Sequence, residues 1–530
     1  MKFRDFLYIY LIALMVITTA GLLQRSAGYM DAEYYASVGS GILAGDGFNQ
    51  NILWNYLDDP MGIPHPSNTY WMPLASILST ISVTFSLVGH KTTLWVLNIL
   101  FSSLIPVLTA WITFGFTKRR GDAWFTGLLA IFSGFYLLYY AIPETFAASM
   151  VFGSLLIILL TVNGDAESLK INPFIRWGLV GIFAGLLHMT RAEGFLWIAI
   201  AAGYLIFLTI KNKEYKKGFK SAGFLIIGYL VVSGGWYLRN IYYWHQLFPP
   251  GSSRTLWLIN YDQTFTFPAN QLTFQNWLNQ GFPTIVASRR DALWMNIKSI
   301  LAVQGGILLL PFIVAGWWIK KKNPRMVIAV LYYGLVFILM TLVFPFAGSR
   351  GGFIHSAAGV QPFFWAMVPI GLDRFLGWGG RKRGWPLDEA RRVFQIGLVL
   401  IMVLLTSVIF YQRVLETQNG ISAWQVEENH YFSIHEELVA KKILKPDSVV
   451  MIKNPPGWYF VTGLPAVVIP DADESTVRNI SKRFNADILI LEKDHVNGLN
   501  SLYNTSLSKI GLVKIMEIGT TQIFSLNLGN

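Results

Sequence analysis

The sequence predicts an all-α membrane bundle of about eleven transmembrane helices with external juxtamembrane helices, followed by a small external α/β domain. Two observations carry the membrane part. The 530 residues are 53% hydrophobic with a mean hydropathy of +0.45, and 14% are charged, against roughly 25% in soluble proteins. Apolar windows with almost no charge also recur along the chain, and a membrane span needs about 20 such residues. The third observation, a change of composition after residue 412, predicts the α/β domain.

The predicted helices follow from these windows. The first window lacks a small-residue cleavage site before Gln24, so we interpret it as a retained helix rather than a signal peptide. Residues 177–189 are too short for a full span, and we expect them to form a hairpin with the next helix whose tip reaches the outer interface. The expected helices cover residues 6–23, 93–116, 123–141, 146–162, 177–189, 194–210, 221–238, 299–319, 326–343, 360–376 and 393–411.

The basic residues predict the orientation in the plasma membrane. Loops rich in Lys and Arg stay in the cytoplasm, and a cytoplasmic N-terminus places more than half of the 42 Lys and Arg residues in cytoplasmic segments. Residues 71–88 are therefore predicted to lie along the outer interface, because a span there would reverse every later loop. The same distribution explains the net charge of +12 without a nucleic-acid partner. The chain has no cysteine, which excludes disulfides and thiolate metal sites.

The predicted domains follow from this layout. Residues 1–412 form the membrane domain, with long external loops at residues 24–92 and 239–298, and residues 413–530 form the external domain. In this last part five short β-branched runs alternate with a segment of helical spacing at residues 473–484. Such alternation is typical of an α/β domain.

Two carboxylates follow the first helix directly. Asp31 and Glu33 stand two residues apart at the start of the first external loop, beside an apolar surface. Desolvation raises the pKa of a carboxyl group, which suits a general base. The same residues suit the first turn of a helix that begins near Tyr34, because acids favour helix N-termini. Both roles stay open at this stage.

An outer turn at residues 344–359 carries three glycines beside Arg350 and His355. Glycine lets a backbone approach a ligand closely, and the two side chains offer cationic donors. The turn therefore predicts a site for an anion such as a phosphate. The chain contains no P-loop motif. No His or Asp cluster at ligand spacing predicts a metal site, and the need for a divalent cation stays open.

The order of several motifs resembles the GT-C glycosyltransferases, in particular the protein O-mannosyltransferases and the lipid A aminoarabinose transferases. Asp31-Ala-Glu33 matches the acidic motif of their first external loop, and Tyr70-Trp71 opens the apolar stretch at the end of that loop. His65-Pro66 stands where the aminoarabinose transferases have Lys-Pro. The resemblance covers roughly residues 1–360 and rests on motif order.

Three further motifs extend the resemblance. Glu144 after Pro143 matches an acidic outer turn of the family. The run from Gly185 to Gly194 contains Thr-Arg-Ala-Glu, with Arg191 and Glu193 at matching positions. Trp236-Tyr-Leu-Arg239-Asn240 is similar to a family motif at the outer end of a helix.

The resemblance implies transfer of a sugar from a polyprenyl-phosphate donor to an acceptor at the external membrane face, with inversion. Asp31 is then the base, with Glu33 beside it. The expected contacts to the donor phosphate or lipid are Arg191, Arg239, Arg350, His355 and His65, and those to the sugar or acceptor are Tyr34, Glu144, Glu193 and Trp71. Two alternatives stay open: a transporter or flippase of lipid-linked sugars, and a non-catalytic relative that binds polyprenyl lipids.

Overall fold

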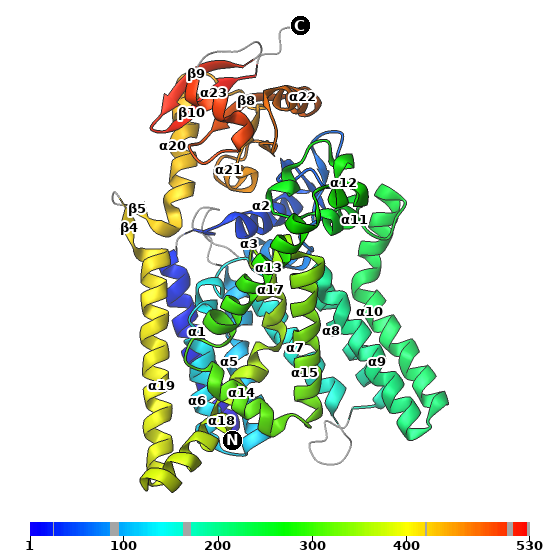
Figure 1. Cartoon of the computed structure of the whole chain (residues 1–530), viewed down its shortest axis with the longest axis vertical. Helices are drawn as coiled ribbons and strands as arrows, with labels where there is room; N and C mark the ends of the chain where they lie inside the picture. The colour runs from blue at the N-terminus through cyan, green and yellow to red at the C-terminus, as the bar shows by residue number, and fades with distance from the viewer. Residues whose placement is uncertain (25, 85–94, 163–170, 419–420, 506–511, 527–530) are drawn as a thin grey trace.

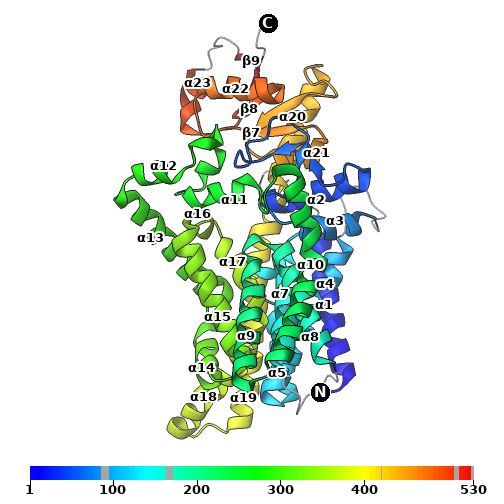
Figure 2. The same ribbon diagram turned by 90° about the vertical axis from the view of Figure 1, so that its right-hand side faces the viewer.

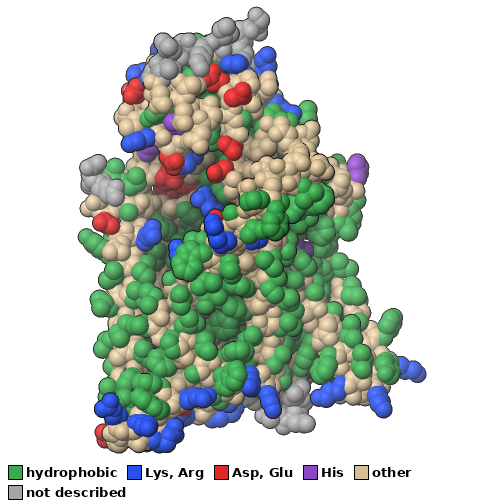
Figure 3. Space-filling model, in the orientation of Figure 1, with side chains coloured by type: hydrophobic (Ala, Val, Ile, Leu, Met, Phe, Trp, Pro, Cys, Tyr) green, Lys and Arg blue, Asp and Glu red, His purple; other side chains and the backbone are tan. Residues whose placement is uncertain are grey.

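The computed structural model describes the whole chain except residues 25, 85–94, 163–170, 419–420, 506–511 and 527–530. Long helices form a bundle, and a sheet flanked by helices covers one end of it (Figure 1). The N-terminus lies at the opposite end of the bundle in both views (Figure 2). Hydrophobic side chains cover the bundle, whereas Lys and Arg gather at the end away from the sheet (Figure 3).

Within the described residues, seven helices are long and apolar enough to cross a membrane. They are Phe3–Gln24 (α1), Val96–Thr117 (α4 and α5), Pro173–Thr190 (α8), Ala192–Asn212 (η3 and α9), Tyr215–Trp244 (α10), Pro324–Val343 (α15 and η8) and Leu387–Leu415 (α19 and η10). The expectation that the fifth predicted helix is too short to span is wrong. Asn172 caps α8, its side chain accepting from the amide of Phe174 at 2.9 Å, so the helix begins at Pro173.

Two predicted spans are interrupted at glycines. The helix predicted at residues 123–141 is α6 (Arg120–Ile131) and a short 3-10 turn, Tyr136–Tyr139, with Gly134 between them at φ 67°. The helix predicted at residues 299–319 breaks at Gly306, whose φ is 48°, and resumes as α14 (Leu310–Lys320). L side chains rarely adopt such φ values. The count of eleven spans stays a prediction.

Helices α7 (Phe146–Thr161) and α18 (Gln361–Arg383) begin within a residue of their predicted starts. Close packing of α8 against α10 depends on small residues. A Cβ added at Gly181 would lie 2.1 Å from the carbonyl oxygen of Leu225, and one at Gly228 would lie 2.1 Å from that of Gly178. Backbones of membrane helices approach this closely only where side chains are small.

The two long predicted loops contain helices that lie between the bundle and the sheet. The first loop holds α2 (Met30–Ala44), which ends at Gly45 with φ 99°, and α3 (Leu74–Thr84). The last residues of the predicted interfacial helix, 85–88, lie outside the described residues. The second loop holds α11 (Pro250–Arg254), α12 (Phe274–Asn279) and α13 (Phe282–Ser299).

The sheet layer consists of a six-stranded sheet and helices α20 to α23. Its strand order is β2-β7-β6-β8-β10-β9, in which the first four strands are parallel and the last two antiparallel. The strands are Ile52–Leu53 (β2), Ala466–Val468 (β7), Val449–Ile452 (β6), Ala486–Leu491 (β8), Thr521–Ser525 (β10) and Val513–Ile518 (β9). The helices are Val426–Ala440 (α20), Pro455–Thr462 (α21), Glu474–Phe484 (α22) and Asn500–Thr505 (α23).

Strands occur at all five positions predicted in the C-terminal part, and α22 begins after Asp473, whose carboxylate accepts from the amide of Thr476 at 3.0 Å. The sixth strand, β2, comes from the first loop. It pairs in parallel with β7, Ile52 opposite Ala466 and Leu53 opposite Val467. The sheet therefore crosses the predicted boundary at residue 412, and the division into two domains stays a prediction.

Candidate active site

A cavity of about 1200 Å³ lies between the helical bundle and the sheet layer. Its walls come from α2, the turn that follows β3 (His65–Pro66), the α8–α9 junction, the end of α10, the segment from η8 to α17 (Gly352–Ala357), and the sheet layer. Figure 3 shows a hollow at this level, with acidic side chains above it and basic ones below. The size is above the roughly 300–1000 Å³ of typical small-ligand pockets.

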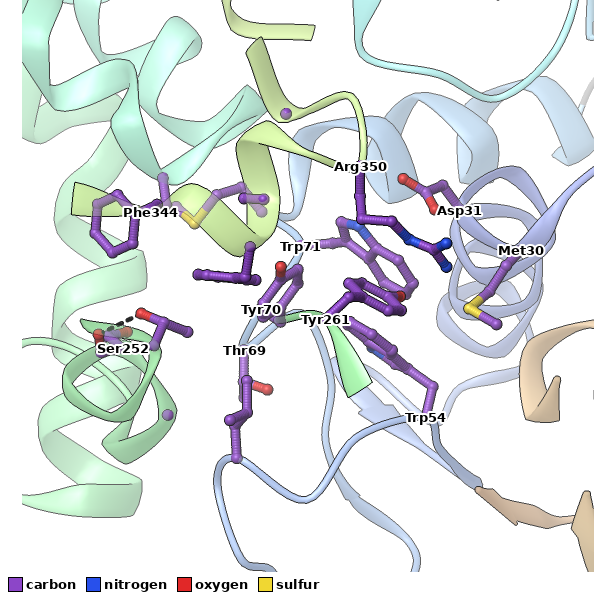
Figure 4. Close-up of a pocket in the computed structure, with 18 of the residues that line it drawn as sticks. Met30, Asp31, Trp54, Thr69, Tyr70, Trp71, Ser252, Tyr261, Phe344 and Arg350 are labelled. Carbon is purple, nitrogen blue, oxygen red and sulfur yellow. Dashed lines mark hydrogen bonds between the residues drawn. The ribbon is translucent and has the colours of Figure 1, made fainter. Parts of the chain in front are cut away.

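Asp31 lies in the first turn of α2 and faces this cavity. Burial raises the pKa of its carboxyl group, and the nearby charges of His355 and Arg191 oppose that shift without cancelling it. A carboxylate with a raised pKa is a better proton acceptor at neutral pH than an ordinary one. Figure 4 shows Asp31 and Arg350 directed into the same space, with Tyr261 and Trp54 beside them.

Arg191 is held at the cavity by its neighbours on the α8–α9 junction. Its Nε donates to Glu193, and the hydroxyl of Ser356 donates to the same carboxylate. Both Arg191 and Glu193 line the cavity. The guanidinium keeps its charge in this setting, so the junction presents a cation whose charge opposes the raised pKa of Asp31.

Glu144, which is buried, pairs with the partly buried His355, with 3.2 Å between Nδ1 of His355 and Oε1 of Glu144. Tyr29 and Thr145 also donate hydrogen bonds to Glu144. Burial raises the pKa of Glu144, but the charge of His355 and the hydrogen bonds from His355 and Thr145 lower it by more, so the carboxyl group stays ionised. The ring of Phe146 stacks on His355 with 4.3 Å between centroids and fixes its orientation.

Asp31, Glu144 and His355 bring potential metal-ligand atoms within 4.8 Å of one another. No local sequence pattern indicates this cluster, because the three residues come from three separate segments: α2, the turn before α7, and α17. Carboxylate oxygens and an imidazole nitrogen fit a divalent cation. The hydrogen bonds of Glu144 compete with that use of its oxygens.

Arg350 completes the basic side of the cavity. Its guanidinium lies 4.4 Å from the ring centroid of Tyr261, within cation–π distance. Trp71 lies deeper and stacks on Trp54, with 4.1 Å between centroids and 22° between planes. We refer to Arg191, Arg350 and His355 as the basic half of the cavity.

Five predicted site residues lie outside the cavity lining, and one of them, Glu144, contacts His355 as described above. Glu33 points to the sheet layer, where it accepts from the side-chain amide of Asn454 at 3.0 Å. His65 is buried against Gln50 and the carbonyl oxygen of Ile52. The hydroxyl of Tyr34 accepts from the amide of Asn68 at 2.7 Å.

Arg239 is the fifth. Its guanidinium lies 4.1 Å from the ring of Trp236 and donates to the backbone oxygens of Phe48 and Ser67. These contacts join α10 to the first loop. The geometry therefore gives Arg239 a structural contact, while Glu144 touches the site through His355 and Asp31.

The cavity also contains residues that sequence reasoning missed. Tyr29, Tyr70 and Tyr261 line it, as do side chains of the sheet layer such as Asp471 and Asp494. The aromatic residues could not be separated from an interfacial belt by composition. No local sequence pattern predicts that residues of the sheet layer line the cavity, because β2 brings the first loop next to that layer only in the folded protein.

No protein-family model and no curated protein matches the chain. Among solved structures, ArnT from Cupriavidus metallidurans bound to undecaprenyl phosphate aligns over 99% of both chains, with a TM-score of 0.56 and 13% identity. ArnT in the apo state aligns with a TM-score of 0.56 and 12% identity, over 98% of this chain and 97% of the ArnT chain. The oligosaccharyltransferase of Archaeoglobus fulgidus in the apo form aligns with a TM-score of 0.51 and 12% identity, over 93% of this chain and 70% of the oligosaccharyltransferase chain.

The chain has the GT-C fold. ArnT, a lipid A aminoarabinose transferase, and the oligosaccharyltransferase are both GT-C type membrane glycosyltransferases. At 12–13% identity the likeness concerns the fold. Together with the seven apolar helices it identifies the chain as an integral membrane protein.

Proposed function

We propose that this protein transfers a sugar from a polyprenyl-phosphate-linked donor to an acceptor hydroxyl at the external face of the membrane. The observation that carries the proposal is that one cavity holds both Asp31, a carboxyl group with a raised pKa, and the basic side chains of Arg191, Arg350 and His355. A proton acceptor facing a phosphate-binding surface is the pair of functions that such a transfer needs. The GT-C fold, and undecaprenyl phosphate in the aligned ArnT structure, support this donor class.

The proposed chemistry is a single displacement at the anomeric carbon of the donor sugar. Asp31 takes the proton of the acceptor hydroxyl, and the acceptor oxygen forms a bond to the anomeric carbon from the face opposite the phosphate. The bond between that carbon and the phosphate oxygen breaks, and its electron pair leaves with the polyprenyl phosphate. Arg191, Arg350 and His355 stabilise the negative charge that develops on this leaving group. Attack opposite the leaving group inverts the anomeric configuration.

The orientation is part of the proposal. The cavity and the sheet layer lie at one end of the bundle, and Lys and Arg gather at the other end (Figure 3). The positive-inside rule places the basic end in the cytoplasm. The cavity, the sheet layer and the acceptor are then external to the plasma membrane.

Asp31, Glu144 and His355 are the residues that would hold a divalent cation. A bound cation would supply positive charge next to the leaving phosphate. Dialysis against EDTA tests its presence: loss of transfer with recovery on adding Mn²⁺ supports a bound cation. Unchanged transfer leaves charge stabilisation to the three side chains of the basic half.

The function is tested with purified protein in proteoliposomes and a radiolabelled sugar on polyprenyl phosphate. Asp31→Asn removes the base with almost no change in size and should lower the initial rate by about 10²–10⁴-fold. Asp46→Asn is the matched control, because Asp46 is exposed at the other end of α2, and it should keep the wild-type rate. Full activity of Asp31→Asn would exclude the proposed role of Asp31.

A further inference from the structure

The first four strands of the sheet end at the cavity. Strands β2, β7, β6 and β8 are parallel, so their carboxyl ends meet at one edge. Ligands of open α/β sheets bind outside this edge. The residues that follow these strands and line the cavity include Trp54 after β2, Ile469 and Asp471 after β7, Lys453 after β6, and Asp494 and His495 after β8. We refer to this side of the cavity as the sheet half.

The sheet half differs in charge from the basic half. Asp471 and the neighbouring Asp262 have no hydrogen bond or ion pair through their side chains within the described part of the chain, and burial, together with the charge of Asp262, raises the pKa of Asp471. Lys453 is paired with Asp494. The sheet half therefore presents free carboxylates, which repel a phosphate and accept hydrogen bonds from hydroxyl groups.

Aromatic residues join the two halves. Tyr261 contacts Arg350 of the basic half and lies on the same wall as Trp54 and Tyr70 (Figure 4). Tyr70 and Tyr261 are only partly buried, so part of each ring is free to pack against a ligand. Rings and carboxylates together suit a sugar, whose ring packs on an aromatic face while its hydroxyls donate to the carboxylates.

The cavity also has room for two reactants. A volume of about 1200 Å³ exceeds the roughly 300–1000 Å³ that hold a single small ligand. A donor sugar and its phosphate in the basic half leave the sheet half unoccupied, and Asp31 lines the same cavity.

We propose that the carboxyl edge of the parallel strands, with Asp471 and Asp262, is the acceptor subsite and that it binds a neutral, hydroxyl-rich glycan. This assignment rests on the proposed function, since it presumes that a donor phosphate occupies the basic half. It gives the sheet layer a direct part in substrate binding. It also explains why the first loop contributes β2, because this strand fixes the loop that carries Asp31 to the wall that binds the acceptor.

The test is binding of the detergent-solubilised protein to an array of neutral, phosphorylated and amino-sugar oligosaccharides, with a lysine-rich peptide on the same array. Wild-type protein should bind neutral glycans, and the double variant Asp262→Asn with Asp471→Asn should weaken that binding at least tenfold. Asp447→Asn is the matched control, because Asp447 is an exposed carboxylate that precedes β6 at the opposite edge of the sheet. This control should bind like the wild type.

The proposal is overturned if no neutral glycan binds, if the double variant binds as well as the wild type, or if only the peptide binds. The proposed function is judged separately, from binding of free undecaprenyl phosphate and from Asp31-dependent sugar transfer. Failure of the glycan array with intact transfer would refute the subsite alone. Absence of transfer and of undecaprenyl phosphate binding would refute the proposed function.

Discussion

Asn454 connects α2 of the first loop to the sheet layer, and replacing it by Ala should loosen α2. Its side-chain amide donates to Glu33 at 3.0 Å and to Glu427 at 3.1 Å, and its oxygen accepts from the amide of Gly457 at 3.1 Å at the start of α21. Burial, with the charges of Glu427 and Glu428, raises the pKa of Glu33. The amide of Asn454 is the donor that opposes this shift, so its loss leaves a buried carboxyl group without compensation.

The magnitude follows from these contacts. A buried acceptor that loses its donor costs about 1–3 kcal/mol, and loss of a helix N-cap costs about 1 kcal/mol. Asn454→Ala should therefore weaken the docking of α2 on α21 by about 2–4 kcal/mol. Local opening of α2 would become roughly 30-fold to 700-fold more frequent, at tenfold for each 1.4 kcal/mol.

Hydrogen–deuterium exchange of the backbone amides of α2 measures this opening. Asn454→Ala should speed exchange in α2 and α21 and lower the rate of sugar transfer, because Asp31 lies on α2. Asn479→Ala, an exposed position in α22, serves as the control and should leave exchange in α2 unchanged. Exchange in α2 that is the same in Asn454→Ala and the wild type would refute the proposed connection.

Three other perturbations have defined outcomes. His355→Gln removes a charge that lowers the pKa of Asp31, so the acid limb of the pH–rate profile should move to higher pH. Burial and the charge of Glu427 raise the pKa of Glu492 from 4.5 to about 7. The free energy of unfolding therefore falls as pH rises through this range. Glu492→Gln should remove a decline of about 3 kcal/mol between pH 4 and pH 8, measured by thermal or denaturant unfolding. Arg191→Lys loses bidentate phosphate contact and should raise the donor KM about tenfold in initial-rate measurements.

A specific result would contradict each of these three predictions. An acid limb at the same or lower pH in His355→Gln would show that the imidazole does not influence the base. An unchanged pH dependence of unfolding in Glu492→Gln, with Glu436→Gln as an exposed control, would refute the assigned shift. A normal donor KM in Arg191→Lys would place the phosphate elsewhere in the cavity.

The sequence predicted local features well because their causes are local. The five C-terminal strands follow from β-branched runs, and α22 follows from its Asp473 cap. Broken helices were harder to predict, because a hydropathy window averages over Gly134 and Gly306, whose positive φ values end the helical geometry.

The arrangement of the candidate site could not be predicted from local sequence patterns. Asp31 and Glu33 look like a pair in the sequence, but both lie on α2, and residues two apart on a helix do not face each other. Asp31 therefore faces the cavity while Glu33 contacts Asn454. The cluster with Glu144 and the parallel pairing of β2 with β7 join distant segments, for which the sequence carries no local pattern.

We propose that the cavity that contains Asp31 carries out sugar transfer, with inversion, from a polyprenyl-phosphate donor. The most direct measurement follows a labelled donor of known anomeric configuration in proteoliposomes, together with the amount of free polyprenyl phosphate and the configuration of the product. We predict one polyprenyl phosphate released for each sugar transferred, with inverted configuration in the product. Retained configuration would contradict the single displacement assisted by Asp31, and movement of intact donor across the bilayer without bond cleavage would identify a transporter instead.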